Sequence, residues 1–218
     1  MNTILITKDP KIAKYSIDSG VNLIMVDLEF IGKKDRQKNF DTILSTHSID
    51  DVKIISEIIP NSNLIVRVNP INENTENEIE SILEYMPKYI MLPMFKNKND
   101  LIHVLKIIDG RSLLIPLIEL PTAFMKLEDY LDLKNIGFFY FGLNDINIKM
   151  GNQFLFESIA YDLLKPYFDL LNKKKLSFGF GGMAKLNEGM LPGKLVLSEH
   201  IRHNSNYVIL SRAFHNNS

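Results

Sequence analysis

The chain has 218 residues, of which 45% are hydrophobic, so it can bury one sizeable core or two small ones. Its 25 basic and 26 acidic residues give a formal net charge of −1 without a basic stripe, which argues against a nucleic-acid partner. The absence of cysteine excludes disulfides, thiolate catalysis and thiolate metal sites.

The first ten residues, MNTILITKDP, contain neither a basic leader nor a long apolar stretch, so we expect no signal peptide. No window reaches the roughly 18 uninterrupted apolar residues that a membrane span needs. We therefore expect a soluble, cytoplasmic protein.

Short apolar runs rich in β-branched residues recur along the chain, and each predicts a strand. In chain order they are TILIT (3–7), LIMVDLE (23–29), LIVRVN (64–69), YIMLP (89–93), LLIPLIE (113–119), FFYFGLND (138–145), SFGFGG (177–182) and YVILSR (207–212). Near-continuous apolarity, without alternation, is typical of strands that are buried on both faces of a parallel sheet.

Helix signals separate these runs. Helix starts are indicated at Asp9-Pro10, at Ser48 and at Asn74, and the stretch from Pro166 to Lys175 ends in a basic last turn. Eight strands with seven helical crossovers are the count of a single TIM (β/α)8 barrel, and an open doubly wound sheet is the alternative. We find no linker and expect one domain, residues 1–218. Little chain follows the eighth run, so we expect the barrel to lack a full eighth helix.

Polar residues gather where the predicted strands end, which is the active face of a TIM barrel. Such clustering is the strongest argument within the sequence for an enzyme, because random placement would scatter these residues along the strands. In chain order they are Asp27, Glu29, Arg67, Asn69, Glu119, Asn144, Asp145, Gly181, Gly182 and Arg212.

Glu119 and Asp145 end neighbouring predicted strands, which run about 4.8 Å apart in a sheet. Two carboxylates so close repel each other unless a cation or a shared proton relieves them. An oxygen-only pair without cysteine or a nearby histidine suits a hard cation, Mg²⁺ or Mn²⁺. In the alternative interpretation, Asp145 caps the following helix and Glu119 pairs with Arg67.

The guanidinium of Arg67 could grip a substrate carboxylate in bidentate fashion, or form a structural ion pair with Glu29 or Asp27. The glycines after Phe180 could let backbone N–H groups approach an anion, although glycines after a strand are usually a turn. His47 is a candidate proton-transfer group. We expect His200 and His203, three residues apart, on a solvated helix face.

Seven motifs in one order resemble the HpcH/HpaI family, which contains the 2-oxo-acid aldolases and the citrate lyase beta subunits. They are LIMVDLE, LIVRVNP, YIMLPMF, PLIELPTA, GLNDINIKMG, FGFGGMA and VILSRAF, and they span residues 23–214. The resemblance implies a TIM barrel, a divalent cation held by Glu119 and Asp145, and Arg67 against the carboxylate or enolate oxygen of a small carboxylate substrate. It also implies main-chain amides around Asn144 that hold that carboxylate.

The implied reaction makes or breaks a carbon–carbon bond through a metal-bound enolate of a small 2-oxo acid. The candidate catalytic residues are Arg67, Glu29, Asp27 and His47, and the candidate metal ligands are Glu119 and Asp145. The candidate substrate-binding residues are Arg67, Asn144, Asp145, Gly181, Gly182 and Arg212.

Phe30 departs from both branches of the family, since it stands where the aldolases have a histidine and the citrate lyases tend to have a further acid. The general base therefore has no assigned residue. One alternative is a lyase or thioesterase that acts on an acyl-CoA thioester and binds the CoA phosphates with Lys33, Lys34 and Arg36. The other is a barrel that binds metal and carboxylate without turnover. The chain lacks the family's C-terminal exchanged helix, so we expect a homo-oligomer that covers the apolar flank between strands eight and one.

Overall fold

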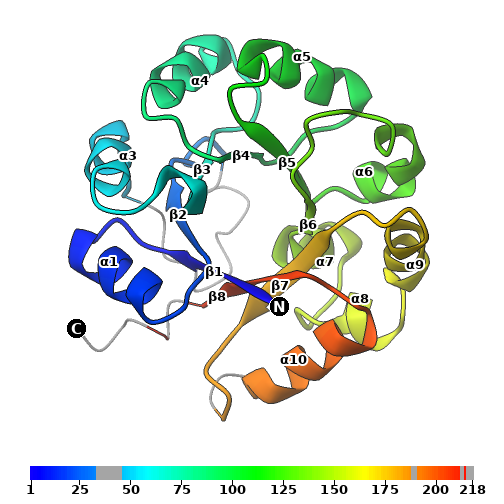
Figure 1. The fold of residues 1–218 in the computed structure, drawn as a ribbon. Helices are drawn as coiled ribbons and strands as arrows, with labels where there is room; N and C mark the ends of the chain where they lie inside the picture. Colours follow the sequence, from blue (N-terminus) through cyan, green and yellow to red (C-terminus); the bar gives the residue numbers. More distant parts are fainter. Residues whose placement is uncertain (33–45, 188–190, 212–213, 215–218) are drawn as a thin grey trace.

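A computed structural model describes residues 1–32, 46–187, 191–211 and 214 of the chain. Eight parallel strands close into a barrel in the order β1 to β8, with β8 paired to β1. Figure 1 shows the strands at the centre and the helices in a ring around them. This arrangement confirms the TIM barrel and excludes the open doubly wound sheet.

The strands lie where the apolar runs predicted them, but most end earlier. Their bounds are β1 Asn2–Ile6, β2 Leu23–Asp27, β3 Leu64–Arg67, β4 Tyr89–Leu92, β5 Leu113–Ile118, β6 Phe139–Phe141, β7 Phe178–Met183 and β8 Tyr207–Leu210. As a result, Glu119 is the first residue after β5, and Glu29 and Asn69 are the second residues after β2 and β3.

The helices alternate with the strands, and their starts follow the sequence signals. Asp9 caps the first helix by accepting hydrogen bonds from the N–H groups of Lys11 and Ile12. The described helices are α1 Pro10–Asp18, α3 Ile49–Ser56, α4 Thr75–Leu83, α5 Lys98–Ile108, α6 Pro121–Met125, α7 Leu143–Met150, α8 Glu157–Ala160, α9 Lys165–Lys173 and α10 Gly193–Arg202, with 3-10 turns η1 Asn61–Asn63 and η2 Leu127–Tyr130.

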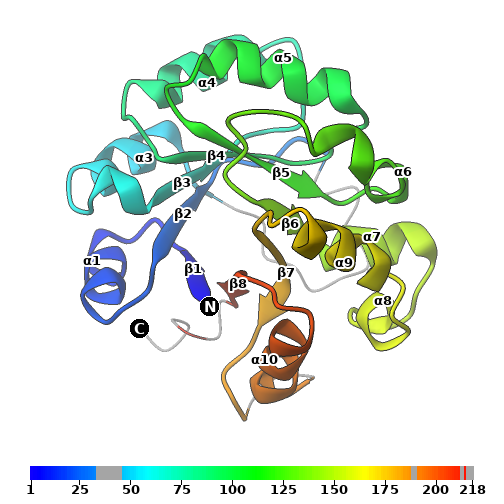
Figure 2. The same ribbon diagram turned by 45° about the vertical axis from the view of Figure 1, so that its right-hand side comes forward.

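Two apolar layers hold the barrel together. Side chains from inside the barrel, among them Ile4, Met25 and Ile65, form one cluster, and the outer faces of the strands pack with the helices in a second, larger one. Figure 2 shows helices standing beside the strands on the outside of the barrel. None of the described helices is long and apolar enough to cross a membrane.

The seam between β8 and β1 lies between α10 and α1 (Figure 1). After β8 the structure describes only Ser211 and Phe214, so the lack of a full eighth helix stays a prediction. The apolar flank that we expected to find exposed here is nevertheless buried, because Leu5 is 3%, Val208 0% and Leu210 7% exposed. That reason for a homo-oligomer was therefore wrong, and the oligomer itself stays a prediction.

Candidate active site

Seven of the ten predicted strand-end residues meet in a cavity of about 180 Å³ at the C-terminal end of the barrel, whereas Asp27 does not line it and Asn69 lines a neighbouring cavity. Strands, the loops directly after them and the first turn of α7 supply its polar residues, since parallel strands bring their C-terminal ends to one face. Leucine and isoleucine side chains from β5, α7, the loop before α8 and β8 form part of the wall. The lining residues are Glu29, Arg67, Leu117, Glu119, Tyr140, Gly142, Leu143, Asn144, Asp145, Leu155, Gly181, Gly182 and Ile209.

Arg67 is held in place by Asp27, which lies opposite it in the β2–β3 register. Nε and Nη2 donate to the two carboxylate oxygens at 2.8 and 2.7 Å, and Glu29 Oε2 lies 3.5 Å from Nε. The ion pair that we considered as the structural role of Arg67 is therefore present. The same side chain also lines the cavity, and the donors on Nη1 are not used by Asp27.

Glu119 is a buried carboxylate without an ion pair to Arg67. Its side chain accepts a hydrogen bond from the N–H of Met94 at 3.1 Å, the one hydrogen bond of this carboxylate within the described chain. Burial, then the nearby charges of Glu29 and Asp145, hold the pKa of Glu119 well above its usual range. The alternative in which Glu119 simply pairs with Arg67 is therefore wrong.

Asp145 lies in the first turn of α7, not at the end of β6 as predicted. The chain leaves the strand at Gly142, which precedes the helix and makes no side-chain cap, so Asp145 is not the helix cap either. The carboxylate is 4% exposed and lines the cavity close to Glu119. A carboxylate in the first turn is favoured by the helix dipole.

Gly142 brings α7 close to Glu119. A Cβ atom added at Gly142 would come within 2.7 Å of Glu119 Cγ and 3.0 Å of Oε1. Only glycine therefore leaves room for the Glu119 carboxylate beside the start of α7. The close approach explains why a glycine follows the aromatic residues of β6.

Two buried carboxylates fit the ligand set of a hard divalent cation. Among the residues that the structure describes, no group of three or more His, Cys, Asp or Glu side chains is placed to hold a metal ion. Mg²⁺ is commonly bound through one or two carboxylates, with water and substrate oxygens completing its octahedron. Burial, then repulsion from Glu29 and Asp145, raises the pKa of Glu119, and a cation held by Glu119 and Asp145 would relieve that repulsion.

The glycine run after Phe180 lines the cavity, but with a different group from the one expected. The carbonyl oxygen of Gly181 accepts a hydrogen bond from the Tyr140 hydroxyl at 2.6 Å. We expected N–H groups turned toward an anion, whereas here the carbonyl of Gly181 is turned toward the barrel interior. Gly181 has a φ of +57°, in the left-handed region that favours glycine.

His47 does not reach the carboxylate cavity. Its Nδ1 accepts a hydrogen bond from the N–H of Asp27 at 2.9 Å, and its ring lines a neighbouring cavity of about 510 Å³ together with the exposed Phe30. His47 therefore lies at the C-terminal end of β2 beside the carboxylate cavity, and its role in proton transfer stays a prediction. Arg212 and the predicted phosphate-binding residues Lys33, Lys34 and Arg36 lie outside the described residues.

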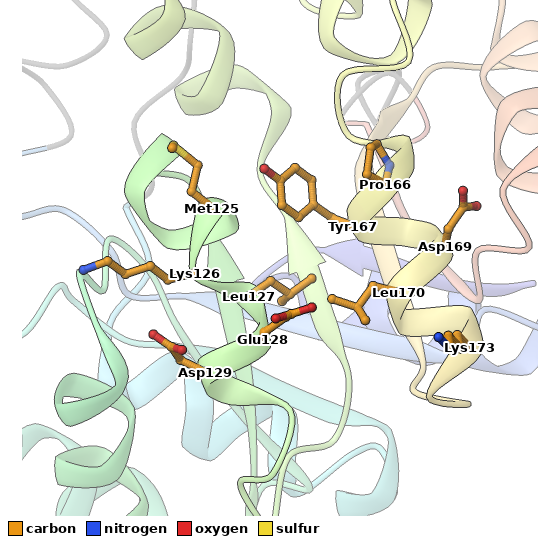
Figure 3. Close-up of a pocket in the computed structure, with 10 residues that line it drawn as sticks. All are labelled: Met125, Lys126, Leu127, Glu128, Asp129, Pro166, Tyr167, Asp169, Leu170 and Lys173. Carbon is orange, nitrogen blue, oxygen red and sulfur yellow. The ribbon is translucent and has the colours of Figure 1, made fainter.

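A larger groove, of about 550 Å³, lies on the outside of the barrel between η2 and α9. Figure 3 shows Leu127 and Leu170 facing each other across it. Its charged residues are a mixture of acids and lysines, and none comes from the C-terminal end of a strand. This groove is about three times the volume of the carboxylate cavity, but the convergence of buried charged groups favours the smaller cavity.

Sequence reasoning missed the apolar wall of the cavity and Tyr140. Leu117, Tyr140 and Ile209 point into the barrel from β5, β6 and β8. Alternation along a strand could have indicated Leu117 and Tyr140, because residues two apart point to the same face. Leu117 stands two residues before Glu119, and Tyr140 stands two residues before Gly142. Leu143 and Leu155 had no such signal, because the helix and the loop that carry them were not predicted there.

No protein-family model and no curated protein sequence matches this chain. Solved structures do resemble it. A HpcH/HpaI aldolase/citrate lyase family protein from Burkholderia cenocepacia has a TM-score of 0.74 at 10% identity, with 96% of this chain and 87% of that chain covered. The HpcH/HpaI aldolase from Desulfitobacterium hafniense has a TM-score of 0.73 at 10% identity, covering 96% and 85%.

A citrate lyase beta subunit from M. tuberculosis, complexed with oxaloacetate and magnesium, has a TM-score of 0.70 at 10% identity, with 95% of this chain and 90% of that chain covered. At this level of identity the likeness shows the fold alone. The barrel that the sequence motifs implied is thus confirmed, and the similar structures are named for the family that those motifs resemble.

Proposed function

We propose that this protein is a divalent-metal-dependent carbon–carbon lyase of the aldolase type, which acts on a small 2-oxo acid through its enolate. The observation that carries the proposal is the convergence of Glu119, Asp145 and Arg67 on one cavity of about 180 Å³ at the C-terminal end of the barrel. The similar structures, including one complexed with oxaloacetate and magnesium, support the choice of a lyase.

Glu119 and Asp145 would hold the cation, Mg²⁺ or Mn²⁺. When bound, it would supply positive charge that stabilises the negative charge developing on the substrate's oxygens. Arg67 adds to this from the protein side. Asp27 holds the Nε and Nη2 atoms of Arg67, so the remaining N–H donors of the guanidinium keep one direction. The positive charge of Arg67 therefore needs no reorganisation during the reaction.

The start of α7 would bind the substrate carboxylate. The N–H of Ile146 donates to the carbonyl of Gly142 at 3.2 Å, so the N–H groups of Leu143 and Asn144 precede the first intrahelical bond. A helix N-terminus favours an anion. Six water molecules would fill a volume of about 180 Å³ at about 30 Å³ each, which indicates a substrate of only a few heavy atoms.

Glu29 is our candidate for the proton acceptor. It is 1% exposed, lines the cavity, and is the remaining carboxylate there once Glu119 and Asp145 are assigned to the cation. Asp27 does not line the cavity and binds Arg67 with both oxygens, which suits a supporting role. Among the described residues that line the cavity none is a lysine, so none of them offers an amine for an imine-forming aldolase.

The test is deuterium incorporation into the methyl group of pyruvate, followed by proton NMR in heavy water with Mg²⁺ or Mn²⁺. We expect exchange that requires both the metal and Glu119, with Glu119→Gln as the inactive variant. Glu78→Gln is the matched control, since Glu78 is a partly buried carboxylate that lines the neighbouring cavity instead. Exchange that is equal in Glu119→Gln and wild type would contradict the proposal.

Absence of exchange in the wild-type protein, with metal bound, would favour one of the two other functions. Labelling or cleavage of an acyl-CoA thioester would then identify the citrate-lyase-like activity. Binding of pyruvate that depends on metal, without any product, would identify a non-catalytic barrel.

A further inference from the structure

The pairing of β7 with β8 is irregular beside the cavity. Gly179 pairs with Tyr207 and Gly182 with Ile209, so three residue steps along β7 match two along β8. Such a bulge leaves one residue of the longer strand out of the ladder. Here the bulge coincides with Gly181 and its φ of +57°.

The hydroxyl of Tyr140 bridges the two strands at this bulge. It accepts a hydrogen bond from the N–H of Ile209 at 2.8 Å and donates to the carbonyl of Gly181 at 2.6 Å, with the carbonyl of Phe180 3.3 Å away. A backbone N–H or carbonyl that is buried without a partner is costly. The hydroxyl therefore replaces ladder bonds that the bulge interrupts.

The ring of Tyr140 reaches this position because β7 has no side chain in its way. A Cβ atom added at Gly179 would come within 2.6 Å of Tyr140 Cε2. Tyr140 is 1% exposed, and burial raises the pKa of its hydroxyl, which stays protonated and able to donate. The same ring lines the cavity beside Arg67 and Glu119.

The bridge also orients the peptide that forms the cavity wall. In a planar trans peptide, the carbonyl of Gly181 and the N–H of Gly182 point in opposite directions. Fixing the carbonyl against Tyr140 thus fixes the N–H of Gly182, and both glycines line the cavity. Glycines have no side chain to hold them, so an external contact has to set their conformation.

We propose that Tyr140 is a positioning residue, whose hydroxyl holds Gly181 and Gly182 in the shape that receives the substrate. This inference rests on the proposed function for the identity of that substrate, a small 2-oxo acid. A phenylalanine would fill the same space and keep the apolar contacts, but it would leave the Gly181 carbonyl and the Ile209 N–H without their shared partner.

The test compares Tyr140→Phe with Tyr130→Phe. Tyr130 is also fully buried, but its hydroxyl has no hydrogen-bond partner in the described structure, so its removal should be silent. Hydrogen exchange of the Ile209 amide reports on the bridge without any substrate. Steady-state labelling of pyruvate with Mn²⁺ gives kcat and KM for each variant.

We expect Tyr140→Phe to speed exchange of the Ile209 amide about tenfold or more. We expect KM for pyruvate to rise about fivefold, with kcat within about twofold of wild type, because substrate placement is lost and the charged groups remain. Tyr130→Phe should match wild type in every measurement.

Unchanged Ile209 exchange in Tyr140→Phe would overturn the bridge. Faster exchange with unchanged KM would make Tyr140 a purely structural residue and would overturn its positioning role. A wild-type protein that leaves pyruvate unlabelled overturns the proposed function and, with it, the substrate part of this inference, while the Ile209 amide still decides whether Tyr140 holds the backbone.

Discussion

Both carboxylate oxygens of Asp27 accept hydrogen bonds from the guanidinium of Arg67, at 2.8 and 2.7 Å. Asp27 is fully buried, and the Arg67 side chain is 13% exposed. The pair therefore sets the direction of the one cation among the described residues that line the cavity. It also means that Arg67 supports both the fold and the site.

Replacing Arg67 with lysine separates these two contributions. Lysine keeps the charge but loses the planar fork, so pyruvate affinity should fall about tenfold while Mn²⁺ affinity holds. Calorimetric titration of both ligands measures the difference. Equal pyruvate affinity in Arg67→Lys and wild type would show that Arg67 has only its structural role.

Removal of the Arg67 charge should destabilise the fold more than removal of the whole pair. Arg67→Met leaves Asp27 buried without its counter-ion, which typically costs about 3–5 kcal/mol of unfolding free energy. Arg67→Met combined with Asp27→Leu should recover much of that loss. Urea unfolding of the single and double variants measures it, and a double variant no more stable than the single one would contradict this account.

The contact between Gly142 and Glu119 gives a test that changes neither carboxylate. In Gly142→Ala the new methyl group would need the space that Glu119 Cγ occupies, 2.7 Å from it, so Glu119 must move. We expect Mn²⁺ affinity to fall about tenfold. Gly182→Ala is the control within the same cavity, because its nearest neighbour is Ile209 O at 3.7 Å. Similar Mn²⁺ affinities in the two variants would show that the position of Glu119 is unimportant.

His200 makes the protein sensitive to acid. It is fully buried against Phe180, with ring centroids 3.9 Å apart, and its Nδ1 lies 2.9 Å from Ser205 Oγ. Burial, then the nearby His203, lowers the pKa of His200 to about 3. Below about pH 6.5 the unfolded chain binds a proton that the folded protein does not, so the unfolding free energy falls by up to about 1.4 kcal/mol per pH unit.

The loss of stability should span the range from about pH 6.5 down to about 3, and it should be absent above pH 7. His203 acts in the same direction, because burial lowers its pKa too, although Arg202, Glu199, Asp162 and Lys165 also influence it. Urea unfolding at several pH values is the measurement. His200→Gln should reduce the change of unfolding free energy with pH. His103→Gln, at an exposed position of α5, should leave that change as it is in wild type. Equal slopes in all three proteins would contradict this assignment.

Sequence patterns were sufficient for the order of strands and for the polar residues at their ends, because apolar runs and strand-end chemistry are local. They were insufficient to predict which charged side chains form ion pairs with one another. Whether Arg67 pairs with Asp27, Glu29 or Glu119 depends on the register between β2 and β3, which places Asp27 opposite Arg67. No local signal in either strand fixes that register.

Two errors have a common cause, namely that a short segment does not reveal what packs on it. The solvated face expected for His200 and His203 is in fact packed against β7 and α9, where Phe180 and Phe168 contact their rings. Asp145 appeared to end a strand because the aromatic run before it continues so far, whereas Gly142 turns the chain into α7.

The central claim is that Glu119 and Asp145 together bind one divalent cation, and a Mn²⁺ titration followed by the electron paramagnetic resonance of the free ion tests it most directly. We expect wild type and Glu78→Gln to bind one Mn²⁺ per chain. Glu119→Gln and Asp145→Asn should each bind it about tenfold more weakly or worse, with unchanged circular dichroism. Wild-type protein that binds no Mn²⁺, or variants that bind it as tightly as wild type, would contradict the account.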